Sequence, residues 1–171
     1  DRPMSPYAAS KCAAEDLCHT WSHLYGLQVV CLRFFTVYGP RQRPDLAIRR
    51  FVELLRQGEP IPRYGDGTSA RDYTFIADIV RGIVAALELD AKFEVINLGN
   101  SSPVPLAELI ELVGRACGVT PAIEELPGQP GDMPHTFADI GKAERLLGWR
   151  PEWSMADGLR EFVEWYDATN G

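Results

Sequence analysis

Two largely apolar, β-branched runs constrain the fold of this chain more than any other feature. The first covers residues 27–35 (LQVVCLRFF) and the second covers residues 93–98 (FEVINL). Runs of this kind are typical of strands that are covered on both faces. Helical segments lie between and around them, and strands that alternate with helices indicate an α/β fold with a parallel sheet.

A parallel sheet with only two such strands has unpaired edges and faces that are not fully covered. We therefore expect residues 1–171 to form a single incomplete unit that belongs to a larger structure. The first residue is Asp1 rather than Met, which agrees with this expectation.

The other elements follow from apolar periodicity and from helix start and stop signals. A helix is predicted over residues 7–25, because Ser5-Pro6 is a good helix opening and Gly26 a good helix end. Further helices are predicted over 46–57, 78–89, 106–117, 140–147 and 155–168, and short strands over 61–64, 71–75 and 122–126. Residues 127–135 (PGQPGDMPH) contain three Pro and two Gly and are predicted to be a loop.

The net charge restricts the partners that the chain can have. The 171 residues carry 24 acidic and 17 basic side chains, for a formal charge of −7. Nucleic acid and anionic membrane surfaces require a cationic face, so neither is an expected partner. No apolar stretch is long enough to span a bilayer, and no basic leader precedes an apolar run.

The four cysteines favour a reduced, cytoplasmic protein. Cys12, Cys18, Cys31 and Cys117 form no C-x-x-C pair, so we expect thiols rather than a disulfide framework or a metal site. His19 and His23 have a spacing that could bind a metal, but they lack Cys or carboxylate partners, which favours a packing role.

Tyr7 and Lys11 are the first candidates for chemistry. They are four residues apart in a predicted helix and therefore lie on one face. A nearby ammonium favours the phenolate form of tyrosine, which makes the pair a general base or acid for an alcohol–ketone conversion. The alternative for the pair alone is an ordinary surface contact.

The context of this pair resembles one enzyme family. The segment Ser5-Pro6-Tyr7-Ala8-Ala9-Ser10-Lys11 is followed in order by LRFFTVYGPRQRP (32–44), GDGTSARDYTFIADIV (65–80), NLGNSSPV (97–104) and QPGDMPHTFADIGKAERLLGW (129–149). Together these motifs resemble the extended short-chain dehydrogenases/reductases that act on nucleotide sugars. The resemblance covers essentially the whole chain and is greatest to UDP-glucose and UDP-glucuronate epimerases.

The resemblance implies a fold and a division of the chain. Residues 1–45 and 76–100 would be the carboxyl-terminal part of a Rossmann-like parallel sheet with its helices. Residues 46–75 and 101–171 would form the smaller α/β substrate-binding portion. The amino-terminal dinucleotide-binding half would be lacking, because the chain contains no G-x-x-G-x-x-G turn.

The resemblance also implies roles for individual residues. Tyr7 would be the catalytic base, and Lys11 would hold the nicotinamide ribose of NAD and assist Tyr7. Phe34 would lie beside the nicotinamide and Thr36 beside the sugar, where many relatives carry Asn. The substrate contacts would be Leu46 and Ala47 facing the diphosphate, Arg63 and Tyr64 flanking the uracil, Arg71 pairing with the diphosphate, and Asp132 in a loop over the nucleotide.

One of these substrate contacts has an alternative role, and one contact found in many relatives is missing here. Arg71 precedes Asp72, so a local salt bridge is the alternative role for this arginine. Many relatives have an Arg where this chain has Gln129, and the grip on the diphosphate is therefore expected to be weaker here.

The implied activity is C4 epimerisation of a UDP-hexose through a transient 4-keto sugar. We expect the isolated chain to be inactive, because it has no glycine motif for the dinucleotide. The alternatives are a dehydratase or decarboxylase of the same family, and a non-catalytic fragment that binds a nucleotide sugar or self-associates. An apolar helix face formed by Leu17, Trp21 and Leu24 is a candidate homodimer surface, although burial within one subunit would explain it equally well.

Overall fold

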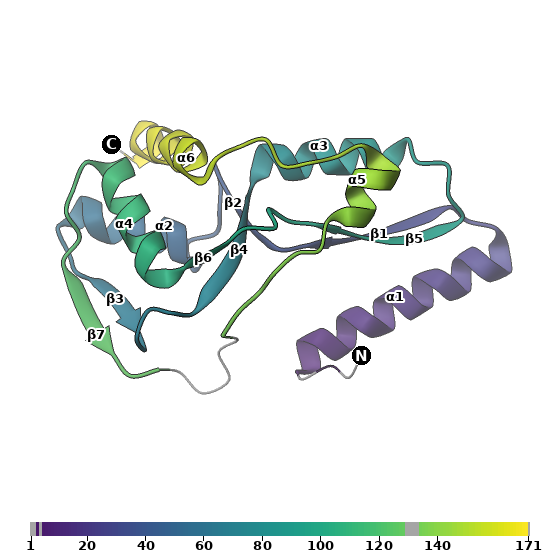
Figure 1. The fold of residues 1–171 in the computed structure, drawn as a ribbon, viewed down its shortest axis with the longest axis horizontal. Helices are drawn as coiled ribbons and strands as arrows, with labels where there is room; N and C mark the ends of the chain where they lie inside the picture. The colour runs from purple at the N-terminus through teal and green to yellow at the C-terminus, as the bar shows by residue number, and fades with distance from the viewer. Residues whose placement is uncertain (1–2, 4, 129–133, 171) are drawn as a thin grey trace.

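A computed structural model describes residues 3, 5–128 and 134–170, and Figure 1 shows the arrangement of their helices and strands. Strand β1 (Val29–Phe34) pairs in parallel with β5 (Phe93–Leu98), with Val29 opposite Phe93 and Phe34 opposite Leu98. The predicted parallel pairing of the two apolar runs is confirmed.

Helices lie on both sides of this strand pair (Figure 1). Helix α1 (Pro6–Tyr25) lies on one side, and α3 (Ile76–Leu87) and α5 (Gly141–Leu147) lie on the other. A small apolar cluster fills the space on the α3 side; its buried members are Ile79, Ile96, Leu98, Ala143 and Trp149.

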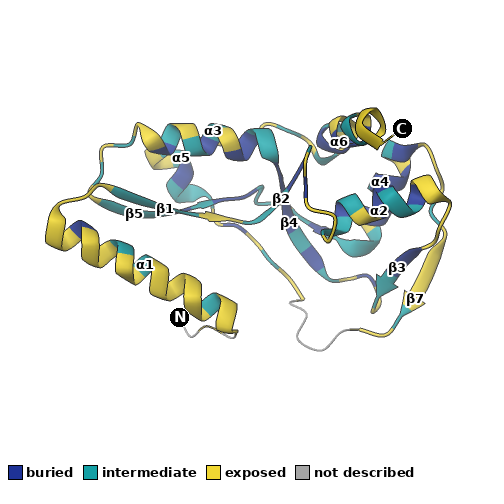
Figure 2. Ribbon diagram, turned by 180° about the vertical axis from the view of Figure 1, so that it is seen from behind, coloured by how far each residue is buried: buried dark blue, intermediate teal, exposed yellow. Residues whose placement is uncertain are grey.

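The expectation that both apolar strands are covered on both faces is wrong for β1. Its residues Val29–Leu32 are only half-buried, and Arg33 and Phe34 are exposed. Helix α1 covers the second face incompletely, because Ser22 is its single buried residue among those described; Figure 2 shows the helix as mostly exposed. Apolar composition predicted the strand correctly, but the burial of its faces depends on segments that are distant in the sequence.

A larger core lies beside the β1–β5 pair. Its strands are β2 (Thr36–Tyr38), β4 (Ala70–Phe75) and β6 (Pro103–Pro105) in one sheet, and β3 (Ile61–Tyr64) with β7 (Ile123–Leu126) in another. Its helices are α2 (Ala47–Gln57), α4 (Leu106–Cys117) and α6 (Met155–Asn170). The division of the chain between residues 45 and 46, 75 and 76, and 100 and 101 stays a prediction.

The sheet of the larger core is not purely parallel. Strand β2 pairs in parallel with β4, but β6 pairs antiparallel to β4. Strands β2 and β6 are three residues each, which is too short to predict a strand, and β6 also begins and ends with proline. Their pairing with β4 creates them.

Helix α1 begins and ends where its sequence signals predict. Ser5 precedes the helix, and its Oγ accepts a hydrogen bond from the Ala8 N–H at 3.1 Å. Gly26 ends the helix in the left-handed conformation, with φ of 67°, and its N–H donates to the Ser22 carbonyl. Tyr7 is thereby fixed in the first turn of the helix.

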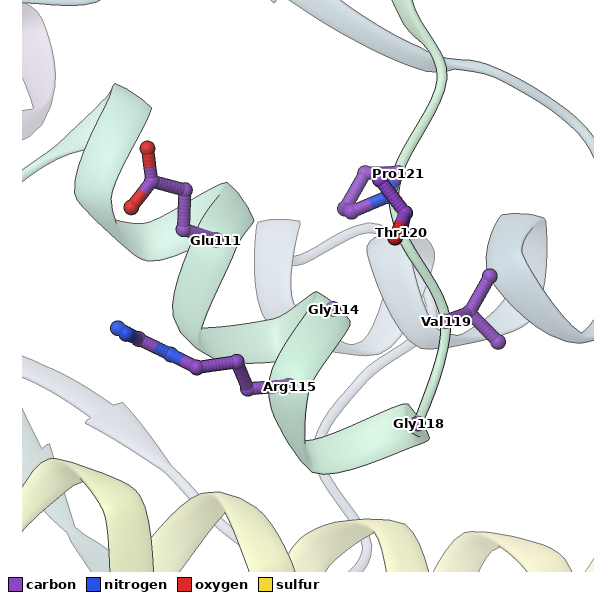
Figure 3. A pocket seen from close by; sticks show the side chains of 7 residues that line it. All are labelled: Glu111, Gly114, Arg115, Gly118, Val119, Thr120 and Pro121. Carbon is purple, nitrogen blue, oxygen red and sulfur yellow. The ribbon is translucent and has the colours of Figure 1, made fainter.

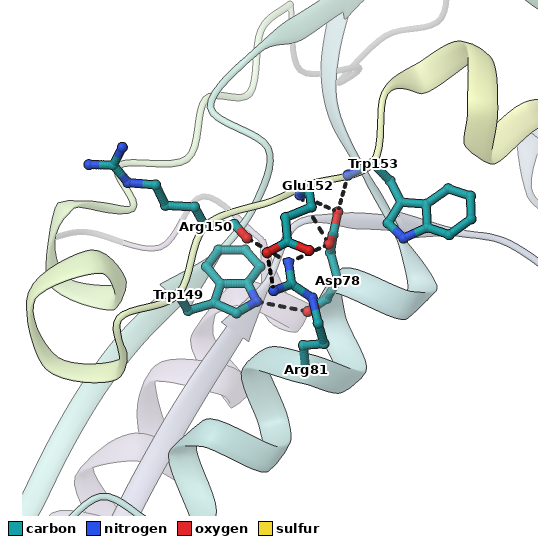
Figure 4. Close-up of polar contacts among 6 residues, drawn as sticks. All are labelled: Asp78, Arg81, Trp149, Arg150, Glu152 and Trp153. Atoms are coloured by element: carbon teal, nitrogen blue, oxygen red, sulfur yellow. Dashed lines mark hydrogen bonds and ion pairs between the residues drawn. The ribbon is translucent and has the colours of Figure 1, made fainter.

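A buried carboxylate connects the two cores (Figure 4). Asp78, near the start of α3, is 1% exposed and accepts hydrogen bonds from the Glu152 and Trp153 N–H groups at 3.0–3.1 Å. It also accepts one from Arg81 Nη2 at 2.7 Å, and its carbonyl accepts one from Trp149 Nε1 at 2.8 Å. Trp149 belongs to the small cluster and Trp153 packs against the large core, so Asp78 holds the linking segment to α3.

We expect Asp78→Ala to lower the free energy of unfolding by about 3 kcal/mol, because it removes the buried acceptor of a guanidinium and of two part-buried backbone N–H groups. Denaturant unfolding measures the change. The matched control is Glu152→Gln, which removes only the exposed arm of the network, where Arg81 contacts a glutamate that is 69% exposed. That change should cost about 0.5 kcal/mol or less. Equal losses in the two variants would contradict the role of Asp78.

Candidate functional site

A cleft of about 400 Å³ opens between the first half of α1 and strand β1. The predicted residues Tyr7, Lys11 and Phe34 line it together with Ala14, Glu15, Cys18, Cys31, Leu32 and Arg33. The Lys11 Nζ lies 5.4 Å from the centroid of the Tyr7 ring. The structure therefore brings together the phenol, the ammonium and the aromatic ring that the sequence singled out for cofactor chemistry.

Helical geometry explains why these groups meet. Tyr7, Lys11 and Glu15 are spaced by four residues and so follow one face of α1. Phe34 is the last residue of β1, at the carboxyl end of the strand. Tyr7 is 71% exposed, so its hydroxyl is open to a ligand from outside this chain.

An ion pair that the sequence analysis did not single out holds this cleft. Arg33 donates from Nε and Nη2 to the two carboxylate oxygens of Glu15, at 2.7 and 2.6 Å. Hydrogen bonding to Arg33 lowers the pKa of Glu15, and the reciprocal contact raises the pKa of Arg33. The sequence held a signal for this pair, because Glu15 continues the Tyr7–Lys11 spacing and Arg33 is the single charge in an apolar strand.

The predicted diphosphate contacts lie at the start of α2. Leu46 occupies the N-cap position of that helix without a side-chain cap, and Ala47 is its first residue. Leu46 lines a second cleft, of about 230 Å³, with Ile76 and residues 37–43. Thr36 begins β2, two residues after Phe34 at the end of β1.

The other predicted substrate contacts lie on strands of the larger core. Arg63 and Tyr64 end β3, and Arg63 Nη2 donates to Glu125 Oε1 at 2.6 Å. Arg71 lies in β4, and its Nη1 donates to the Ala70 carbonyl at 3.0 Å. These residues do not line the cleft that holds Tyr7. Asp132 lies outside the described residues.

Asp72 accepts hydrogen bonds from backbone groups of two distant segments. It is fully buried, and its carboxylate accepts hydrogen bonds from the Asn100 N–H at 2.6 Å and the Ala138 N–H at 3.0 Å. Consecutive strand residues point to opposite faces, so Asp72 and Arg71 point away from each other. Asp72 thus ties β4 to the end of β5 and to the segment before α5, a role that its sequence position did not reveal.

A further hollow in the described part of the chain contains none of the predicted site residues. Figure 3 shows this hollow, of about 400 Å³, at the carboxyl end of α4, lined by Glu111, Gly114, Arg115, Gly118, Val119, Thr120 and Pro121. Within residues 3, 5–128 and 134–170, no group of three or more His, Cys, Asp or Glu side chains could hold a metal ion. No helix in the same residues has the length and apolar character needed to cross a membrane.

Comparison with known proteins decides the family. The family model described as the NAD dependent epimerase/dehydratase family matches residues 1–99. The chain belongs to this family. The match contains the Tyr7–Lys11 helix, both strands of the β1–β5 pair and the residues predicted at the start of α2.

The relatives share both sequence and fold with this family member. A UDP-glucuronate 4-epimerase of Thermodesulfobacterium geofontis is 46% identical over 166 residues, which are 96% of this chain and 51% of the relative. The crystal structure of a Bacillus cereus UDP-glucuronic acid 4-epimerase with UDP-glucuronic acid and NAD superposes with a TM-score of 0.91 at 38% identity, over 98% of this chain and 54% of that one. A UDP-glucose 4-epimerase of Thermotoga maritima gives 0.95 at 32% identity, over 99% and 56%.

The chain spans about half the length of the curated relatives that it matches. The described cleft fits one end of a nicotinamide dinucleotide: it offers a phenol and an ammonium from α1 and an aromatic ring from β1. The sequence has no glycine-rich turn for the pyrophosphate. The residues present thus suit the nicotinamide ribose rather than the whole cofactor.

The Glu15–Arg33 pair predicts a pH dependence. Because the folded-state pKa of Glu15 is lowered from 4.5, the pair stabilises the fold above that pH, and its contribution is lost as the pH falls through the lower folded-state value. Glu15→Gln should therefore lower the Tm at pH 7 and make little difference in acid. Thermal unfolding from pH 7 to pH 3 measures this. The exposed neighbour provides the control Asp16→Asn, and a Tm gap for Glu15→Gln that does not change with pH would contradict the assignment.

Proposed function

We propose that this chain carries the catalytic Tyr–Lys pair and the substrate-binding portion of an NAD-dependent UDP-sugar 4-epimerase. The observation that carries the proposal is the placement of Tyr7, Lys11 and Phe34 around one cleft beside the exposed edge of the β1–β5 pair. The family and the names of the relatives support the reaction class.

Each residue of the cleft has a definite task in this proposal. Tyr7 removes the proton from the sugar C4 hydroxyl, and the ammonium of Lys11 lies beside its ring. Lys11 also donates to the nicotinamide ribose, and Phe34 packs beside the nicotinamide. Bound NAD supplies the acceptor for the hydride from C4. The Glu15–Arg33 pair keeps α1 at the distance from β1 that this arrangement requires.

The larger core would hold the nucleotide part of the substrate. Arg63 and Tyr64 flank the uracil, and Arg71 offers a planar fork of donors to the diphosphate. Leu46 and Ala47 place the first turn of α2 toward the same diphosphate, where the positive end of the helix dipole favours an anion. The Glu125 carboxylate accepts a hydrogen bond from Arg63 and so sets the position of that side chain.

Activity requires a dinucleotide-binding segment, so the 171-residue polypeptide alone should not turn over UDP-glucose or UDP-glucuronate. The part of the Thermodesulfobacterium geofontis relative that this chain does not match, fused ahead of residue 1, should supply that segment and restore NAD-dependent epimerisation. Chromatography and mass measurement of the product sugars determine the turnover by the unfused chain and by the fusion. Turnover by the unfused chain would overturn its inactivity. A product lighter by water or by carbon dioxide would favour a dehydratase or a decarboxylase.

Within the fusion, Tyr7→Phe should lower kcat by roughly 10²–10⁴-fold, because it removes the base while keeping the ring. Tyr25→Phe is the matched control, since Tyr25 is an equally exposed tyrosine at the other end of α1. It should leave kcat unchanged. If the fusion binds NAD and UDP-sugar but Tyr7→Phe is as active as the parent, the catalytic role is wrong.

A second candidate function is self-association through α1. Leu17, Trp21 and Leu24 are 61%, 53% and 63% exposed on the side of the helix that faces away from β1, and Trp21 stacks on Tyr25 with ring centroids 4.9 Å apart. An exposed apolar face of this kind favours a homodimer in which two copies of α1 pack together.

The cytoplasmic location that we propose agrees with the four free cysteines.

Trp21→Glu should convert this dimer to a monomer, because it places a charge at the centre of the apolar face. Light scattering coupled to size exclusion gives the mass. Leu87→Glu is the control, since Leu87 is 81% exposed on α3, away from α1, and the change should leave the mass unaltered. A parent protein that is monomeric at high concentration would contradict the dimer.

A further inference from the structure

Two of the four cysteines face each other across the α1–β1 contact. Cys18 on α1 and Cys31 on β1 are both half-buried free thiols, and both line the cleft that holds Tyr7 and Lys11. Cys12 is exposed and Cys117 is buried in the larger core. Neither Cys18 nor Cys31 has a task in the proposed epimerase chemistry.

The contacts that flank Cys18 along the helix fix its pairing with Cys31. Glu15 binds Arg33 at 2.6–2.7 Å, and the Ser22 hydroxyl donates to the Lys92 carbonyl at 2.9 Å. Glu15, Cys18 and Ser22 follow one face of the helix, three to four residues apart. Cys31 and Arg33 lie on one face of β1, because alternate strand residues share a face.

The spacing along the two elements agrees. From Glu15 to Cys18 the helix advances about 4.5 Å, and from Arg33 back to Cys31 the strand covers about 6.6 Å. Cys18, which follows Glu15 along the helix, therefore meets Cys31, which precedes Arg33 along the strand. A third contact beyond the thiols, where the His19 ring lies edge-on to Phe93 at 4.9 Å, keeps the helix against the sheet.

The surroundings of Cys31 agree with a thiol–thiol contact. Burial raises the pKa of Cys31 to about 11, and the neighbouring Cys18 adds to this increase. Cys31 therefore stays protonated near neutral pH.

We propose that Cys18 and Cys31 are a redox-sensitive dithiol that closes to a disulfide and fixes α1 to β1. The oxidant class is a small disulfide such as oxidised glutathione. The Cys18 thiolate attacks one sulfur of the oxidant and releases one of its thiols. Cys31 then loses its proton and attacks Cys18 Sγ, which releases the second thiol. Two thiols and one small disulfide thus give one protein disulfide and two small thiols.

The bond would change the cleft rather than the core. Bonded sulfurs lie about 2.05 Å apart, so the thiols must approach each other and draw the middle of α1 toward β1. The movement narrows the cleft at the end opposite Tyr7. The same bond closes a short loop of chain between helix and strand and removes freedom from the unfolded state, so the oxidised form should unfold at a higher temperature.

The test treats the 171-residue protein with oxidised glutathione, blocks the remaining thiols by alkylation, and maps the digest by mass spectrometry without reduction. We expect one linked peptide pair that contains Cys18 and Cys31. The link should persist in Cys12→Ser and Cys117→Ser and disappear in Cys18→Ser and Cys31→Ser. The Tm should rise on oxidation, return with dithiothreitol, and stay constant in Cys31→Ser.

Three outcomes would overturn the proposal: both thiols remaining reduced or carrying separate glutathione adducts, a link that joins Cys12 instead, or a link between two protein molecules on a non-reducing gel. None of these readouts depends on epimerase activity. Failure of the disulfide is therefore distinguishable from failure of the proposed function.

Discussion

The carboxylate of Asp78 is the interaction on which the arrangement of the two cores depends. It receives the backbone N–H groups of Glu152 and Trp153 and the guanidinium of Arg81, all within 3.1 Å. A buried carboxylate is unfavourable unless such donors replace water, and here they come from segments more than 70 residues apart in sequence. The linking segment between α5 and α6 therefore has one position relative to α3. Helix α6 can complete the larger core only because that segment is held.

The side of the molecule that carries Tyr7 is held together differently. Helix α1 contributes almost nothing to either apolar cluster, and it contacts the β1–β5 pair through Glu15–Arg33, His19–Phe93 and Ser22–Lys92. Polar and edge contacts of this kind position an element without burying much apolar surface. The cleft beside them is consequently open, and Tyr7 is exposed. This open character agrees with the proposed role of the cleft in holding a nicotinamide.

Local sequence signals sufficed where the neighbours in the chain decide the structure. Ser5 and Gly26 delimit α1, the apolar runs become β1 and β5, and β3 matches the prediction over residues 61–64. Strands β2 and β6 escaped prediction because three residues carry no period and pairing with β4 is what orders them. Helix α3 begins two residues before the predicted start, at Ile76, directly after β4 ends.

The sequence by itself determined the family motifs, the α/β class and the face of α1 that bears Tyr7, Lys11 and Glu15, because each depends on residues close together in the chain. Only the tertiary structure decided that Glu15 binds Arg33, that Cys18 meets Cys31, and that Asp72 and Asp78 are buried acceptors for distant backbone groups. It also showed that one face of β1 remains poorly covered. The physical reason is the same in each case: burial, hydrogen bonding and charge pairing depend on which distant segments come together, and residue type alone does not specify the partner.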